Sequence, residues 1–482
     1  MIDALPPGWT TAQLGDLLQR IDTGKNIRCI ERPPDANERG IVKISAVSWG
    51  TFQEAESKTV PSGTELDERA RISAGDLLIS RANTIELVGA AVRVQSIQKA
   101  LYLSDKVLRL RADDQIIPWI HRALTTPGAR RAIGDASSGN QLSMRNISQD
   151  ALKALPIPLA PLAEQKRITD KLEALSAKLT ACRERLDRVP TILKHFRKSV
   201  LHDATTGQLT TDWRVANPCT TSNAAADWLR DQIELRRENS QNQRAFKDPV
   251  EPDMTHWNVD VPSTWSVSSV SSFAECLDSR RVPVTKSARK SAKKLYPYYG
   301  ANGIVDMVDD FLFDDELVLV TEDETFYGRE KPIAYRVSGK CWVNNHAHVL
   351  RAPDKTAADY LCYSLAHYNV LPWLTGTTGR AKLTQGVLNS LPIAIPAPPE
   401  QAEIVRRVDE LFALADALER RYETAKAHVE KLMPTILAKA FRGELVPQDP
   451  NDEPASVLLE RIRMAGERAN TASGRPRSAL GR

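Results

Sequence analysis

Two stretches of the chain repeat one another: LPIPLAPLAEQKRITDKLEAL at residues 155–175 and LPIAIPAPPEQAEIVRRVDEL at residues 391–411. The offset of 236 residues continues without a gap to the GQL at 207–209 and the GEL at 443–445. Fourteen of the 55 aligned pairs are identical, where about three are expected by chance from ordinary residue frequencies. A chain that carries one long segment twice is built from two similar halves.

Each repeat has the pattern of a long helix. From Ile168 to Val200 apolar residues recur at steps of four and three, and the residues from Ile404 to Ile436 follow in the same phase. Because a coiled-coil seam requires this 3.5-residue period, we expect the two helices to pair with each other. The alternative is that each helix belongs to an ordinary bundle.

Prolines mark the starts of these helices and interrupt them. Helix is predicted to begin at about Ala163 and Pro399, since a first-turn proline lacks only an N–H that the helix does not need. Pro190 and Pro434 lie inside the predicted helices, and each removes one backbone hydrogen bond, so kinks are expected there. About forty helical residues at roughly 1.5 Å each make a rod of roughly 60 Å.

The rest of the chain is also paired. The opening LPPGWTTAQLGDLL (5–18) resembles VPSTWSVSSVSSFA (261–274), and each is followed by short β-like runs, a helical stretch and a glycine-containing polar turn. We therefore predict an α+β fold: two mixed α/β domains separated by two long helices in an antiparallel coiled coil, with an internal pseudo-two-fold repeat. The predicted boundaries are 1–154 and 257–390 for the mixed domains, 155–209 and 391–446 for the helical spacers, 210–256 for a linker with a short helix, and 447–482 for a C-terminal helix and disordered tail.

The composition is that of an ordinary globular protein. The 482 residues are 42% hydrophobic and 26% charged, with a net charge of +4. The N-terminus lacks the pattern of a signal peptide, and no apolar run approaches the roughly 20 residues that span a bilayer. The six cysteines show no CxxC spacing and are predicted to be reduced thiols. We expect a cytoplasmic protein with no membrane partner.

The sequence contains no recognisable catalytic or cofactor motif, such as GxGxxG, a P-loop or HExxH. The HAH at 346–348 would place two imidazoles on one face of a strand. A zinc site needs three or four ligands, and Cys341 is the one further candidate, so no metal site is predicted. Glu330 and Lys331 are adjacent, which is not the spacing of a nuclease site. We expect a chain that binds no cofactor and is no enzyme by itself.

A basic run, residues 280–294, precedes the aromatic stretch YPYYGANG at 296–303. The run carries seven arginines and lysines and no acidic residue, in a chain whose net charge is only +4. Such grouping indicates a polyanionic partner. Phosphate contacts position a protein on DNA without reading its sequence. The residues predicted to make them are Lys286, Arg289, Lys290, Lys293 and Lys294.

Taken together, these motifs resemble the specificity subunits of type I restriction–modification enzymes. The resemblance extends over essentially the whole chain and is carried by IPLAPLAEQKRITDKL, APPEQAEIVRRVDELFALAD, ILAKAFRGEL, LPPGW and YPYYGANGI. It implies two target-recognition domains that each read half of a split double-stranded DNA sequence, and helical spacers that set the gap. It also implies two methyltransferase subunits and, through them, two motor-nuclease subunits as partners. S-adenosylmethionine, ATP and Mg²⁺ would be bound by those partners, in the cytoplasm of a prokaryote and on its nucleoid.

Side-chain chemistry suggests which residues contact bases, since Arg and Lys suit guanine and Asn suits adenine. The candidates are Arg81, Asn83, Lys106, Asn140 and Gln141 in the first domain, and Asn302, Arg329, Arg380 and Lys382 in the second. The two domains share little sequence, which implies an asymmetric target. The alternatives are a recognition subunit of a related phage-exclusion or methylation-only system, and a coiled-coil scaffold without sequence recognition. A scaffold would not require two elaborate globular domains.

Overall fold

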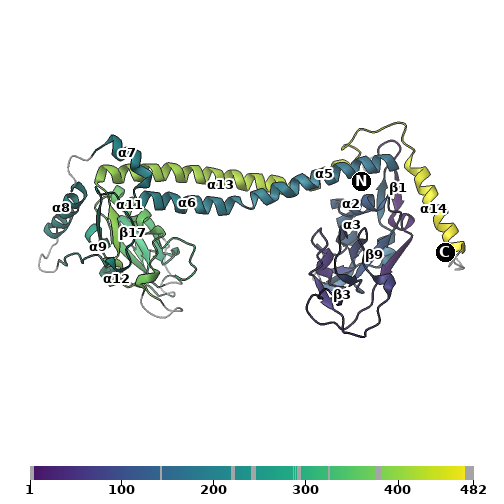
Figure 1. Ribbon diagram of the computed structural model, residues 1–482, viewed down its shortest axis with the longest axis horizontal. Helices are drawn as coiled ribbons and strands as arrows, with labels where there is room; N and C mark the ends of the chain where they lie inside the picture. The colour runs from purple at the N-terminus through teal and green to yellow at the C-terminus, as the bar shows by residue number, and fades with distance from the viewer. Residues whose placement is uncertain are drawn as a thin grey trace. The chain divides into compact units, whose positions relative to one another are not determined.

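The computed structural model describes residues 5–141, 144–218, 223–239, 246–285, 287, 289, 295–323, 326–374 and 381–472. The chain divides into two compact units. The first unit consists of Met1–Leu186 and Thr424–Arg482, and the second of Asp187–Glu423. Each unit therefore contains one mixed α/β block and part of both repeated segments (Figure 1). No described helix has the length and apolar character needed to cross a membrane.

The repeated segments are the long helices of the protein. The first segment forms α5 (Leu162–Leu186) and α6 (Val189–Thr205), and the second forms α13 (Pro398–Ala440). Both begin one residue before the predicted start. Pro190 falls in the first turn of α6, where it needs no N–H partner, so the first segment is interrupted as predicted. Pro434, in contrast, lies within the continuous helix α13.

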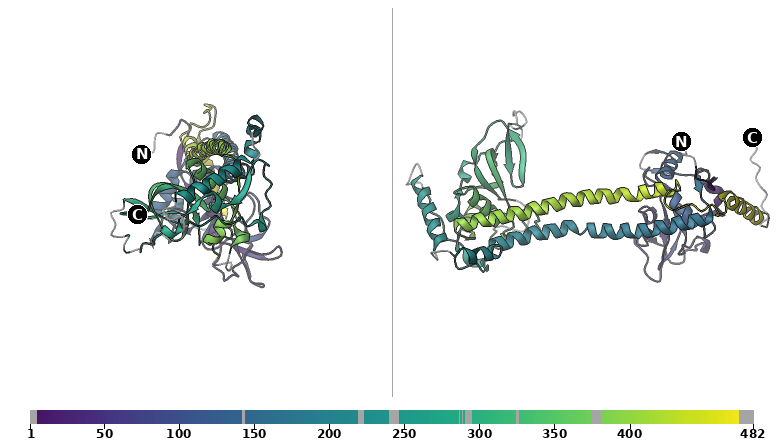
Figure 2. Two further views of the ribbon diagram at one scale, coloured as in Figure 1. Left: turned by 90° about the vertical axis from the view of Figure 1, so that its left-hand side faces the viewer. Right: turned by 90° about the horizontal axis from the view of Figure 1, so that it is seen from above.

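In the second unit α6 and the first part of α13 run side by side in opposite directions (Figures 1 and 2). Arg197 of α6 pairs with Asp416 and, at 3.0 Å, with Glu419 of α13. Nearer the start of α13, Arg407 reaches Asp212, which follows α6, at 2.7 Å. The earlier residue of α6 thus contacts the later part of α13, and the residue after α6 contacts the earlier part, as expected for antiparallel helices. The predicted antiparallel pairing is confirmed.

The apolar seam of the helices is buried where it meets a mixed block. Ile168 and Leu172 of α5 are fully buried in the core of the first unit, and Ile404 and Val408 of α13 in that of the second. Leu418, at the same heptad phase, remains 41% exposed. The seam therefore contributes to two cores, and part of its length stays accessible to solvent.

The mixed block of the first unit (first block, residues 5–159) contains a four-stranded antiparallel sheet and a three-stranded sheet. The four strands, in spatial order, are β2 (Arg20–Thr23), β9 (Val107–Arg111), β5 (Leu77–Ser80) and β7 (Ala91–Arg93). The three are β4 (Ser57–Thr59), β3 (Arg39–Val42) and β8 (Ala100–Tyr102). Its longer helices are α2 (Ile117–Leu124) and α3 (Pro127–Ala136). Trp119 of α2 is fully buried and packs against Phe441 with ring centroids 4.5 Å apart.

The mixed block of the second unit (second block, residues 265–395) is built around one six-stranded sheet. Its strands, in spatial order, are β14 (Glu275–Cys276), β19 (Ala347–Arg351), β17 (Phe313–Thr321), β18 (Ala334–Val343), β15 (Tyr296–Gly300) and β16 (Gly303–Val308). Helix α11 (Lys355–Ala366) packs on β17 and β18. Outside the block, α8 (Ala224–Glu238) and α14 (Ala455–Ala472) lie where the linker and tail helices were predicted.

The two blocks are attached to their helices in the same way. In each, the strand after the opening tryptophan pairs antiparallel with the strand before the helix: β1 (Thr10–Gln13) with β12 (Pro156–Leu159), and β13 (Ser266–Ser269) with β20 (Pro392–Ile395). Trp9 then donates from its indole Nε1 to Glu164 at 3.0 Å, and Trp265 to Glu400 at 2.9 Å. These buried tryptophan–glutamate bonds, one in each unit, lock the start of a block to the first turn of its helix.

The two carboxylates differ in their remaining partners. Glu400 also accepts from the Thr210 hydroxyl at 2.7 Å and pairs with Arg214. The other oxygen of Glu164 is buried without a hydrogen-bond partner among the described residues, and burial raises the pKa of this carboxyl. One lock is therefore an ion pair and the other is a lone buried acid.

Candidate nucleic-acid interface

The first block gathers its predicted base-contact residues around one small sheet. This sheet has the order β10 (Ser138–Gln141), β11 (Met144–Asn146) and β6 (Ala82–Asn83). It carries Asn83, Asn140 and Gln141, although the side chains of the last two lie outside the described residues. Arg81 immediately precedes β6, and its backbone N–H donates to the Lys106 carbonyl at 2.8 Å. Arg81 and Lys106 are both exposed. The small sheet and this backbone hydrogen bond thus place the five candidates in one region of the block.

Asn83 is partly committed to the fold. Its amide Nδ2 donates to the Ser48 hydroxyl at 2.9 Å, and its Oδ1 accepts the Thr84 backbone N–H at 2.9 Å. These bonds fix the orientation of the side chain and leave a second Nδ2 hydrogen for a ligand. Beside Ser48 stands Trp49, whose side chain is 67% exposed, an unusual position for so large an apolar group. Trp49 was missed in the sequence because a lone tryptophan between β-like runs normally indicates a core residue.

In the second block two candidates contact each other. The Arg329 guanidinium donates to Asn302 Oδ1 at 2.6 Å and to the Pro332 carbonyl at 3.0 Å. Asn302 itself is exposed in the β15–β16 turn. The arginine therefore holds the asparagine in place and leaves its amide nitrogen to face a ligand.

Of the two remaining candidates of this block, the structure describes Lys382 but not Arg380. Lys382 is exposed, with its Nζ 3.8 Å from Asp323, which also binds the His346 ring at 2.8 Å. Arg380 lies outside the described part of the chain. The position of Lys382 opposite a carboxylate means that a phosphate or base would have to compete with Asp323 for its charge.

Of the five predicted phosphate contacts in the basic run, the structure describes Arg289 alone. Its guanidinium lies 4.8 Å from the ring centroid of buried Tyr298 and 3.2 Å from the Asp306 carboxylate. With 15% of its side chain exposed, Arg289 is placed to hold the loop against the sheet. Lys286, Lys290, Lys293 and Lys294 lie outside the described residues, and their phosphate contacts stay a prediction.

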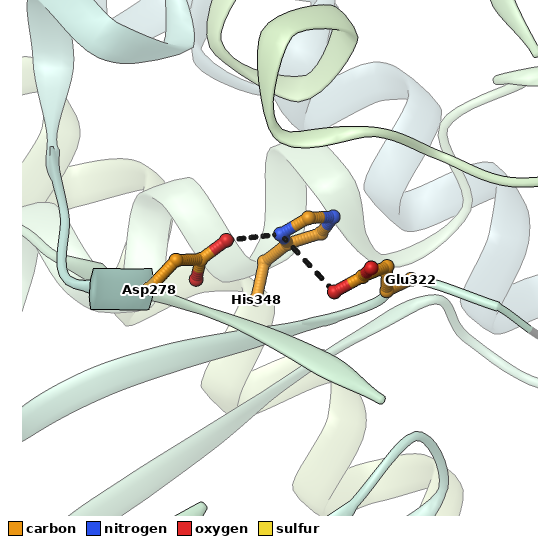
Figure 3. A group of neighbouring side chains, drawn as sticks. All are labelled: Asp278, Glu322 and His348. Atoms are coloured by element: carbon orange, nitrogen blue, oxygen red, sulfur yellow. Dashed lines mark hydrogen bonds and ion pairs between the residues drawn. The ribbon is translucent and has the colours of Figure 1, made fainter. Parts of the chain in front are cut away.

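The second block also contains a cluster of possible metal ligands, at the start of β19 (Figure 3). The ligand atoms of Asp278, Glu322 and His348 all fall within 4.8 Å of one another. His348 Nδ1 lies 2.5 Å from Asp278 and its Nε2 lies 2.6 Å from the Leu383 carbonyl. Both ring nitrogens are thus engaged by oxygen atoms of the protein, and neither is free for a metal ion.

Arg281 supplies a positive charge to this cluster. It lies 2.7 Å from Glu322 and 3.1 Å from Asp278. Burial alone would raise the pKa of Asp278, but hydrogen bonds from His348 and the Val349 backbone, with the charge of Arg281, hold it below its usual value. The cluster is therefore a closed ion network that fixes β19. The two histidines of the HAH motif do not meet, because His346 is exposed while His348 is buried.

The fold defines a class of protein in which two unlike globular blocks are each bonded to the start of a long helix. Comparisons with known proteins identify the family. The family described as the type I restriction modification DNA specificity domain matches residues 6–190 and 262–426. The chain belongs to this family of specificity subunits, as the resemblance of its repeats and openings predicted.

Relatives match along nearly the whole length. The EcoDI specificity subunit of Escherichia coli is 28% identical, with 98% of this chain and 97% of the relative covered. The StySPI specificity subunit of Salmonella potsdam is 27% identical, covering 95% and 96%. Among solved structures, the HsdS subunit from Thermoanaerobacter tengcongensis has a TM-score of 0.55 at 19% identity, over 92% of this chain and 99% of that one. A chain from a type I R-M system gives 0.57 at 18% identity, over 92% and 100%. These likenesses confirm the predicted fold.

Proposed function

We propose that this chain selects the DNA target of a type I restriction–modification complex. The first block reads one half of a split sequence, the second block reads the other, and the helices hold the two at a fixed gap. The observation that carries this proposal is the repeated lock: two different blocks, each bonded through a buried tryptophan to the first turn of its helix. A rigidly held reader can place its side chains within a groove, whereas a tethered one cannot.

The two blocks support an asymmetric target. Apart from the two-stranded sheet that each block forms with its opening strand, the first block has sheets of three and four strands and the second has one six-stranded sheet. Their exposed polar candidates also differ, with Arg81 and Lys106 in one and Asn302 and Lys382 in the other. Because base edges are read by the placement of individual donors and acceptors, such unlike surfaces should recognise unlike half-sequences.

The helices offer surface for partner subunits. On the part of α13 that belongs to the second unit, Leu414 and Leu418 are 52% and 41% exposed. Exposed apolar residues in a row on a helix favour burial by another chain. We assign this surface to two methyltransferase subunits, which in turn bring two motor-nuclease subunits. Those partners bind S-adenosylmethionine, ATP and Mg²⁺, and the chain itself carries out no catalysis. The complex works in the cytoplasm and on the nucleoid.

Methylation mapping tests the proposal. The chain is produced together with its methyltransferase subunits in a host that lacks adenine methylation, and modified bases are mapped at single-base resolution. One split motif with unlike halves and a fixed gap is expected, and it should vanish when this chain is omitted. A continuous motif, or methylation that persists without the chain, would contradict the assignment of target selection to it.

A further inference from the structure

The second unit contains a large groove whose lining includes Arg329 among the DNA-contact candidates. Its volume is about 900 Å³, within the range of sites for cofactor-sized molecules. It is lined by one face of α6, by the end of α11, and by the segments 255–259, 326–333 and 368–373. All of these belong to the second unit, so the groove is formed within one compact body.

The charge of the groove has one sign. Among the described residues that line it there is no aspartate or glutamate. Three cations and three imidazoles line it: Lys198, Arg329, Lys331, His202, His256 and His367. Lys198 and His202 are four residues apart on α6 and so lie on the same face of the helix. A lining with this excess of basic residues attracts an anion.

Nearby acids are already engaged by other groups. Glu330, next to the groove, pairs with Lys194 at 2.5 Å and also feels the charge of Lys198. Asp409 accepts from the Tyr363 hydroxyl, and Asp253, near His256 and Trp373, accepts the Thr255 backbone N–H at 3.0 Å. Burial and then the charges of Lys198 and Lys194 lower the pKa of His367, which reflects the positive field. Arg329 is held by backbone carbonyls, so Lys198 and Lys331 are the cations placed to meet an anionic ligand.

Aromatic rings form another part of the lining. Trp373 lies 5.7 Å from Tyr368 and 5.3 Å from His256, measured between ring centroids. Trp257 also lines the groove, and buried Phe326 and Ile333 contribute apolar surface. Rings that are partly exposed in a concave site are suited to stack on a flat heterocycle.

We propose that this groove binds a nucleoside phosphate, with the base against the aromatic residues and the phosphates at Lys198 and Lys331. A ligand of this class combines a flat ring with a polyanion, which is the combination that the lining provides. An acidic peptide would match the charge but not the clustered rings. The proposal is independent of target recognition by the blocks.

Titration calorimetry on the full chain, with ATP as the probe and without divalent cations, tests this. Saturable binding of one ATP is expected. Adenosine alone and inorganic triphosphate alone should each bind at least tenfold more weakly, because each engages half of the site. The double variant K198Q/K331Q should weaken ATP binding by about tenfold or more, since it removes two charged groups that face the phosphates. The matched control K171Q/K178Q makes the same charge change on exposed α5 positions in the other unit and should leave binding unchanged.

Three results would overturn the proposal. The first is no saturable heat with ATP up to about 5 mM, a concentration at which even a weak site fills. The second is equal binding by K198Q/K331Q and the control variant. The third is binding of a single-stranded oligonucleotide that K198Q/K331Q weakens and ATP does not displace, which would assign the groove to a nucleic-acid strand. Circular dichroism of both variants checks that the fold is retained.

Discussion

The two tryptophan–glutamate locks are equivalent in position but not in chemistry, and glutamine substitution should separate them. In the second unit Glu400 is buried and accepts from Trp265 at 2.9 Å and Thr210 at 2.7 Å, and it pairs with Arg214. The variant E400Q leaves the mostly buried Arg214 charge without its counter-ion. Removing one partner of a buried pair costs about 3–5 kcal/mol. Because 18% of the Arg214 side chain is exposed, we expect a value near the lower limit, about 3 kcal/mol.

The same substitution in the first unit should cost far less. Glutamine at position 164 can still accept from Trp9, and it removes a carboxylate whose second oxygen has no partner among the described residues. We expect E164Q to change stability by less than about 1 kcal/mol. Hydrogen exchange measured by mass spectrometry reports on each unit separately, as the free energy of its opening. Equal losses in the two units, or a larger loss from E164Q, would refute the difference between an ion pair and a lone acid.

A coupling measurement isolates the Glu400–Arg214 pair. R214M alone leaves a buried carboxylate with two neutral donors, and E400Q/R214M removes both charges together. The double variant should be more stable than the sum of the single losses predicts, by about 1–3 kcal/mol, since neither charge is left alone. Additive losses would mean that the pair contributes through packing instead.

Glu164 gives the first unit a pH dependence of known sign. Burial raises its pKa in the folded chain above the usual 4.5. The folded state therefore holds this proton more tightly than the unfolded state does, and the contribution is complete below pH 4.5 and lost as pH rises through the raised value. E164Q should abolish this part of the pH profile of the first unit, and an unchanged profile would contradict the assignment to Glu164.

Three further predictions concern recognition. R81Q with N83A should relax one half of the target only, and N302A with R329Q the other half, at about 1–3 kcal/mol for each side chain that reads a base; blurring of both halves by either pair would contradict separate readers. Replacing the four lysines among the predicted phosphate contacts with glutamine should leave the target motif unchanged. The log–log salt slope of DNA binding should fall by about 0.9 for each phosphate that is no longer neutralised. An altered motif would mean that these lysines read bases. Inserting seven residues in α5 and seven opposite them in α13 lengthens each helix by about 10 Å. Methylation mapping should then show unchanged half-sequences and a gap that is wider by about three base pairs. An unchanged gap would mean that the helices do not set its length.

The long helices could be predicted from sequence because the signal is local and periodic. A 3.5-residue apolar repeat depends on neighbours three and four positions away, and a proline marks the helix start directly. The starts at Leu162 and Pro398 lie within one residue of those predicted. Strands β5, β9 and β17 also overlap short β-like runs of the sequence, which are GDLLISR (75–81), KVLRLR (106–111) and ELVLVTE (316–322). The interruption before Pro190 was predictable for the same local reason.

The locks and the ion network could not be predicted, because their partners are far apart in the chain. Trp9 and Glu164 are separated by 155 residues, and Trp265 and Glu400 by 135. Both halves of the sequence carry a tryptophan near the start of the block and a Glu-Gln pair at the start of the helix. Only the strand pairs β1–β12 and β13–β20 show that the tryptophan and the glutamate of each half come into contact. Likewise His348 was considered with Cys341, which lies near it in sequence, whereas its partner Asp278 is 70 residues away.

The exposed part of the helix seam follows from the same difference between local pattern and tertiary contact. A two-helix pair buries one stripe of each helix, and here the stripe is fully buried where a mixed block covers it, as at Ile404 and Val408. Farther along α13, Ala415 and Tyr422 of the stripe are also buried, whereas Leu418 of the stripe and the neighbouring Leu414 stay about half exposed. About 25 cal/mol is gained for each Å² of apolar surface removed from water, so these positions favour a further chain on the helices. A coiled coil that served only to space two readers would need polar residues there, and the leucines are therefore better explained by the docking of partner subunits proposed above.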